Sequence, residues 1–100
     1  MDPEIPDLTI ADVVRSVAGR DAGGLFYVLE TDGVWLTLVD GRGRTMEKPK
    51  RKKRKHTVKV LHSETRVAAK LRAGDKVLDS ELRRDLTYLS QEMQSINLGG

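Results

Sequence analysis

Lysine and arginine occupy seven of the eight positions from Lys48 to Lys55, and His56 follows them directly. So many like charges are unfavourable in a folded core, so the segment must stay solvated or meet a polyanion. RNA and DNA are the obvious polyanions, because neutralised phosphates release condensed counterions. If about five of these side chains engage phosphates, log affinity falls with log salt at a slope of roughly −3.5 to −4.5.

The net charge of +3 conceals a sharp segregation of charge along the chain. Between Arg42 and Lys59 there are ten lysine or arginine residues and a single acidic residue, Glu47, whereas the remainder of the chain is acidic overall. A cationic strip of this kind creates a local field that steers and holds phosphate groups. The candidate phosphate-binding residues of the strip are Lys48, Lys50, Arg51, Lys52, Lys53, Arg54, Lys55 and His56.

Two plainer interpretations of the strip stay open. It fits a solvated loop without a ligand, and it also fits the basic cluster of a nuclear localisation signal, which requires a eukaryotic source. Duplex DNA would be bound by the same charges as RNA. Base-independent phosphate contacts give affinity with little sequence specificity, so the strip alone does not separate these ligands.

A second candidate site is the glycine-rich segment from Gly19 to Gly24. Its glycines allow backbone conformations and close approaches that a Cβ atom would block. Backbone amides near Gly23 and the Arg20 side chain would then contact a phosphate or ribose. The simpler alternative is that these glycines only make the turn between two strands.

Trp35 and Tyr27 are the candidates for base stacking, because their predicted strand faces are not clearly core. Packing against the core or a helix is the alternative for each. The chain has no cysteine, and His56 and His62 have no convergent carboxylate pair, so we expect no metal site. We also find no catalytic constellation, so we expect a protein that is not an enzyme and uses neither a cofactor nor a small-molecule substrate.

These candidate residues must be positioned by a small β structure. Clusters of β-branched and aromatic residues separated by glycine predict strands at about 12–17, 25–30 and 34–39. Asp32-Gly33 predicts a tight hairpin between the second and third strands. Further strands near 45–48 and 57–61 complete a mainly β barrel of about five strands, with the basic run 48–56 as the loop that joins them.

Two helices are predicted after this barrel. Ser63 is the expected cap of the first helix, and Gly74 is its natural end. In the second helix, apolar side chains repeat with the spacing of one buried face, formed by Leu82, Leu86, Leu89 and Met93. We therefore divide the chain into a barrel at 1–62 and a helical appendage at 63–100 packed on it. A partner protein is an alternative binding surface for the leucine face.

The segment from Asp12 to Val28 resembles the KOW motif of ribosomal and transcription-factor proteins, in which a strand enters an Ala-Gly-Lys-Asp-Lys-Gly type of loop and a second strand leaves it. Arg20 keeps the charge of the family's lysine, whereas Ala22 lacks the second cation. Four positions match the loop as written: Ala18, Gly19, Asp21 and Gly23.

The resemblance extends to small bacterial KOW-domain RNA-binding proteins related to ribosomal protein L14e. It rests on the loop, the Glu47–Lys50 sequence with the basic run after it, and a short helical tail, and it covers roughly 8–86. It implies an SH3-like barrel followed by two short helices, RNA binding, and ribosomal RNA or ribosomal proteins as partners. A protein-interaction module of a transcription or translation factor is the alternative within the KOW class.

The location expected from the sequence is the cytoplasm. The N-terminus is acidic and has no apolar run of the kind found in secretory signals. No segment approaches the roughly 20 apolar residues needed to span a bilayer, so we expect no membrane partner.

Overall fold

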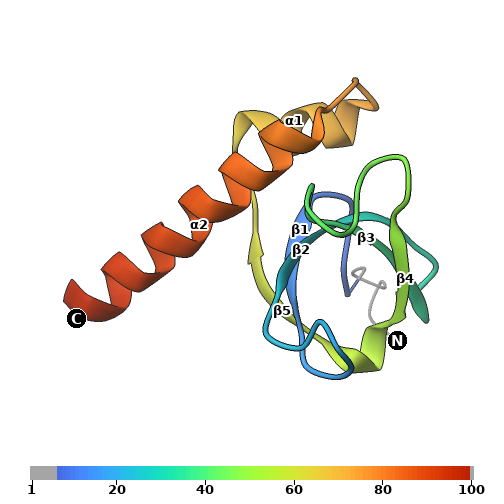
Figure 1. Cartoon of the computed structure of the whole chain (residues 1–100), viewed down its shortest axis with the longest axis horizontal. Coiled ribbons are helices and arrows are strands. Elements are labelled where there is room, and N and C mark those ends of the chain that lie inside the picture. Colours follow the sequence, from blue (N-terminus) through green and yellow to red (C-terminus); the bar gives the residue numbers. More distant parts are fainter. Residues whose placement is uncertain (1–6, 100) are drawn as a thin grey trace, which may run out of the picture.

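The structure is a computed structural model that describes residues 7 to 99, with side chains through residue 94. It is mainly β: a five-stranded antiparallel sheet in the order β4-β3-β2-β1-β5 precedes two helices. Figure 1 shows that the sheet is strongly curved and that α2 lies along one side of it. The elements are β1 (Asp12–Ser16), β2 (Leu25–Thr31), β3 (Trp35–Val39), β4 (Lys50–Lys53), the 3₁₀ turn η1 (Arg54–His56), β5 (Thr57–His62), α1 (Arg66–Ala73) and α2 (Asp79–Gly99).

The predicted mainly β character, with two helices at the end, is confirmed. The predicted fourth strand near 45–48 is wrong, and so is the assignment of the basic run to a loop. Four of its residues form β4, the edge strand that pairs with β3, and the next three form η1. Pro49 immediately precedes β4, where its missing N–H costs no ladder hydrogen bond.

Apolar residues are buried on both faces of the sheet, which explains why β2 has no alternating pattern. One cluster lies inside the curve of the sheet and includes Phe26 and Val28. The other lies between the outer face and the helices and includes Tyr27. Because successive side chains of a strand point to opposite faces, a strand covered on both sides is apolar throughout.

The helices pack on the outer face through the predicted leucine positions of α2. Leu82, Leu86 and Leu89 are buried in the same cluster as Tyr27. At 21 residues α2 is much longer than the short helix expected from the sequence. Within residues 7 to 99, no helix combines the length and apolar character that a membrane span requires.

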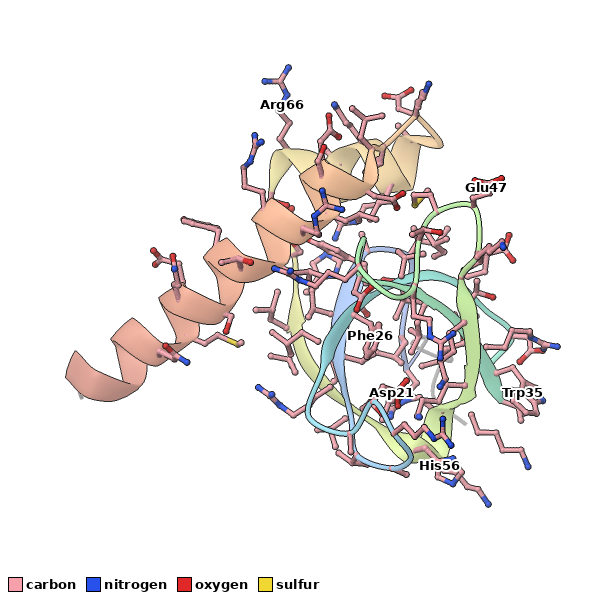
Figure 2. All side chains as sticks on the ribbon, in the orientation of Figure 1. Asp21, Phe26, Trp35, Glu47, His56 and Arg66 are labelled. Atoms are coloured by element: carbon pink, nitrogen blue, oxygen red, sulfur yellow. The ribbon has the colours of Figure 1, made fainter. Side chains whose placement is uncertain are left out.

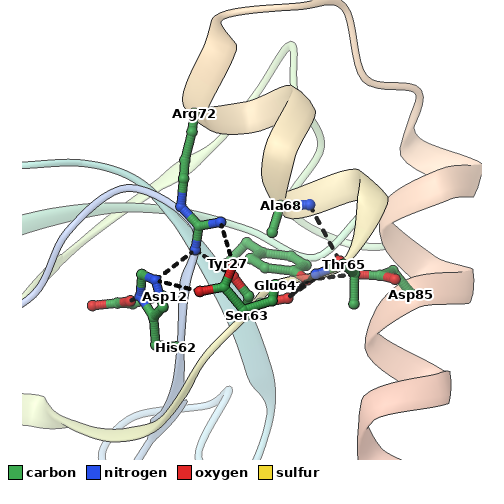
Figure 3. A network of polar contacts seen from close by, with 9 residues as sticks. All are labelled: Asp12, Tyr27, His62, Ser63, Glu64, Thr65, Ala68, Arg72 and Asp85. Atoms are coloured by element: carbon green, nitrogen blue, oxygen red, sulfur yellow. Dashed lines mark hydrogen bonds and ion pairs between the residues drawn. The ribbon is translucent and has the colours of Figure 1, made fainter.

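The first helix begins two residues later than predicted. The Thr65 side chain, not that of Ser63, accepts the hydrogen bond from the Ala68 amide and caps α1. Gly74 ends the helix in the left-handed conformation, with φ of 74°. Ser63 is buried and instead belongs to a polar network beneath the helices (Figure 3).

That network joins the sheet to α2. The Tyr27 hydroxyl donates to Oδ2 of Asp85 on α2 and lies 2.8 Å from Ser63 Oγ. The Thr65 hydroxyl donates to the same carboxylate oxygen at 2.8 Å. Burial and the hydrogen bond to Asp85 raise the pKa of Tyr27 to about 12. A fully buried tyrosine therefore fixes the position of α2 on the sheet.

Candidate nucleic-acid interface

Strand alternation divides the four cations of β4 into two pairs. Arg51 is exposed and Lys53 is half-buried, and both approach the ring of Trp35 on β3. Lys50 and Lys52 reach the carboxylate of Asp21, in the loop between β1 and β2. Successive residues of a strand point in opposite directions, so an all-cationic strand can present one pair to the surface and direct the other inward.

Lys52 is the most constrained of these cations, because only 7% of its side chain is exposed. Its Nζ lies 2.8 Å from the carbonyl oxygen of Ala18 and 2.9 Å from Oδ1 of Asp21. A buried ammonium group needs such partners, since its desolvation is otherwise unfavourable. The turn of the loop requires glycine at position 19, because its φ of +84° is a conformation that L side chains rarely adopt.

Asp21 is the acceptor at the centre of this arrangement. Its Oδ2 lies 3.0 Å from Lys50 Nζ, and its Oδ1 accepts hydrogen bonds from Lys52 and from the Ser16 hydroxyl. Burial would raise the pKa of Asp21, but the contacts with Lys52, Lys50 and Ser16 outweigh it and hold the pKa well below its usual value. Asp21 therefore stays charged and ties the glycine loop to β4.

Three cations of the predicted strip consequently serve the fold. Lys50 and Lys52 are paired with Asp21, so in this structure their ammonium groups contact the loop carboxylate. Arg54 forms an ion pair with Asp7, with Nη2 3.2 Å from Oδ1, and its Nη1 donates to the Thr57 carbonyl at 2.8 Å. These contacts hold η1 against the start of β5 and leave little of Arg54 for a ligand.

Trp35 remains a candidate for ligand contact, whereas Tyr27 does not. Figure 2 shows Trp35 at an edge of the sheet, and the ring is half-buried. The Arg51 guanidinium carbon lies 5.0 Å from the ring centroid and Lys53 Nζ lies 5.4 Å from it, which are cation–π distances. Tyr27 is fully buried under α2, so the interpretation of Tyr27 as a stacking residue is wrong.

A surface groove runs beside Trp35. Its volume is about 810 Å³, and its walls include Ile10, Thr37 and Arg51 as well as Trp35. The walls also include two acidic residues, Glu30 and Asp32. The Trp35 ring and the two cations beside it, rather than the groove as a whole, therefore offer charge and a flat apolar surface to an anionic chain.

Five cations of the basic run and the glycine loop are exposed or half-buried and are not paired with Asp21 or Asp7. We group them with Trp35 under the name basic face, which comprises Arg51, Lys53, Lys55, Lys48, Arg20 and Trp35. Within the described residues none of its five cations makes an ion pair. His56 is half-buried at the end of η1, and Gly23, with φ of +91°, lies in the glycine loop beside Arg20.

No protein-family model matches this chain, and no curated protein is significantly similar to it. The basic face must therefore be understood from its own geometry.

Sequence reasoning missed the pairing of Asp21 with β4, although a signal was present. Lys50 and Lys52 are two residues apart, as are Arg51 and Lys53, and this period defines the two faces of a strand. His62 also has a structural partner, since its Nδ1 lies 2.6 Å from Oδ1 of the buried Asp12. Among residues 7 to 99, no group of three or more histidine and acidic residues is arranged to hold a metal ion.

Proposed function

We propose that the protein binds RNA through the basic face, by phosphate contacts from Arg51, Lys53 and Lys55, with the Trp35 ring positioning Arg51 and Lys53. The observation that carries the proposal is the division of β4, in which Lys50 and Lys52 share the carboxylate of Asp21 while Arg51 and Lys53 are left for an external anion. An arginine beside an aromatic ring suits RNA, because its planar group both stacks and donates to phosphate.

The glycine loop extends this proposed surface. Contacts of Asp21 with β4 bring the loop beside the strand, and Arg20 at its tip is exposed. Arg20 would therefore contact the same phosphate chain as the outward cations of β4. The Gly23 amide would not, because it already donates to the Ser16 carbonyl at 2.7 Å.

The proposal also covers the fold family of the barrel and the location of the protein in the cell. A glycine loop between β1 and β2 agrees with the KOW resemblance, so we propose an SH3-like barrel of that type. The resemblance also favours a ribosomal or translation-associated RNA in the cytoplasm. Duplex DNA is the competing ligand, because the same cations would bind it.

A charge-matched pair of variants tests the proposed function. Arg51→Gln/Lys53→Gln removes two outward cations, and Arg66→Gln/Lys76→Gln removes two exposed cations from the helical part of the chain. With a stem-loop RNA in a filter-binding assay, we expect the first variant to lose at least about tenfold in affinity and the second to bind like the wild type. Equal affinity of the two variants would contradict the proposal, and tighter binding of the matched DNA duplex would reassign the ligand.

A further inference from the structure

A second cationic surface lies between the glycine loop, the turn after β3 and α2. Two adjoining depressions of about 480 and 430 Å³ share Arg42, Arg83, Thr87 and Gln91 in their walls. Arg15 contributes to the first depression and Arg84 to the second. We call this continuous surface the arginine groove. None of its arginines was among the predicted binding residues.

Two of the arginines are held in place by backbone carbonyl groups. Arg15 Nη1 donates to the Gly23 carbonyl at 2.9 Å, and Arg83 Nη1 donates to the Gly41 carbonyl at 2.6 Å. A guanidinium has five N–H donors in a fixed plane, so each keeps other donors for a ligand. Their positions are therefore fixed before any ligand binds, which reduces the entropy lost on binding.

The positive charge of the groove is not cancelled from within. Asp40 is its only acidic wall residue, and Asp40 Oδ1 accepts hydrogen bonds from the amides of Arg42 and Arg44 at 2.8 and 3.0 Å. That carboxylate therefore shapes the turn. Arg42 and Arg84 are both exposed, and neither makes an ion pair within the described part of the chain.

The arginine groove and the basic face lie on different sides of the molecule. Figures 1 and 2 show α2, which forms one wall of the groove, on the opposite side of the sheet from Trp35. The glycine loop borders the groove through Gly23 and Gly24. Two anionic segments can therefore approach the protein from different directions.

We propose that the arginine groove binds the sugar–phosphate backbone of a second RNA segment, so that the protein holds two segments together. The parallel N–H groups of an arginine guanidinium can donate two hydrogen bonds to the oxygens of one phosphate. The hydroxyl groups of Thr87 and Ser90 and the amide of Gln91 can form hydrogen bonds with riboses and bases. An acidic peptide fits less well, because protein interfaces have a contiguous apolar centre, whereas the apolar walls of the groove are divided between Leu25 and Leu86 in the first depression and Tyr88 in the second. The class of ligand rests on the proposed function, whereas the position of the groove does not.

A capture experiment tests this inference on the full chain. One stem-loop RNA is fixed to beads, the protein is bound to it, and retention of a second, fluorescent stem-loop RNA is measured. The groove variant Arg42→Gln/Arg84→Gln changes two exposed side chains, and Arg66→Gln/Lys76→Gln is the charge-matched control. We expect the groove variant to bind the fixed RNA but to retain at least about fivefold less of the second RNA, as loss of two charge-assisted contacts predicts.

Wild-type retention by the groove variant would overturn the inference. Poly-glutamate binding that depends on Arg42 and Arg84, without any such dependence for RNA, would also overturn it and indicate an acidic protein ligand. If instead the basic face does not bind RNA, the Arg51→Gln/Lys53→Gln variant will bind the fixed RNA as tightly as the wild type.

Discussion

Lys52 and Asp21 form an ion pair between β4 and the glycine loop, with Nζ 2.9 Å from Oδ1 and only 7% of Lys52 exposed. The next residue, Lys53, points to the other side of the strand and approaches Trp35. Two adjacent lysines in one basic run thus have different roles. The first stabilises the fold, and the second is available to a ligand.

The two lysines should respond differently to the same substitution. Lys52→Met removes one of the two donors to the Ala18 carbonyl, the other being the Ser16 hydroxyl, and one cation from Asp21, so we expect a loss of about 1–3 kcal/mol in the free energy of unfolding. Lys53→Met should change it by no more than about 0.5 kcal/mol, as is usual at the surface. Urea denaturation of both variants measures the difference, and equal midpoints would show that the Lys52 contacts do not stabilise the fold.

Acid should weaken the same ion pair. The pKa of Asp21 is lowered in the folded state from 3.8, so its contribution is complete above about pH 4 and is lost as the pH falls toward the folded value. The stability difference between the wild type and Asp21→Asn should therefore shrink as the pH drops below about 4. Urea midpoints of both proteins across this range provide the measurement, and a difference that does not vary with pH would contradict this role of Asp21.

Alkali should release α2 from the sheet. Burial and the hydrogen bond to Asp85 raise the pKa of Tyr27 from 10.0 to about 12, so its contribution is complete below pH 10 and declines as the pH rises toward 12. In Tyr88→Phe, Tyr27 is the only tyrosine, and phenolate absorbance should appear near pH 12 together with loss of helical circular dichroism. Phenolate formation near pH 10 in the folded protein would contradict the buried network.

Local periodicity was enough to predict much of this fold. Clusters of β-branched and aromatic residues between turns indicated β1, β2, β3 and β5, and the leucine repeat indicated the buried face of α2. β4 could not be predicted in the same way, because every residue in it is cationic and no apolar pattern marks its two faces. Its inward side is stabilised by Asp21, which is 31 residues away from Lys52 along the chain.

The candidate site was predictable in composition but not in detail. Charge density indicated an anionic ligand, while the separation of paired from outward cations depends on contacts between distant residues. Tyr27 shows the same limit, since its burial depends on α2, and Asp85 lies 58 residues away. The arginine groove likewise combines residues from β1, the turn after β3 and α2.

Trp35 should contribute modestly to RNA binding if its main role is to position Arg51 and Lys53. Trp35→Ala then lowers affinity about two- to fivefold, which corresponds to cation–π contacts of roughly 0.5–1 kcal/mol. Trp35 is the only tryptophan, so its fluorescence reports the contact directly. In a titration with stem-loop RNA, a loss well beyond tenfold would instead indicate a base stacked on the ring.

The salt dependence of RNA binding tests the central claim most directly, because its slope counts the phosphates that the protein neutralises. Affinities of the wild type and of Arg51→Gln/Lys53→Gln for one stem-loop RNA would be measured over a range of salt concentrations. If the two outward cations of β4 each neutralise one phosphate, the slope of log affinity against log salt is shallower by about 1.4–1.8 in the variant. Identical slopes for the two proteins would show that the outward side of β4 does not contact the RNA.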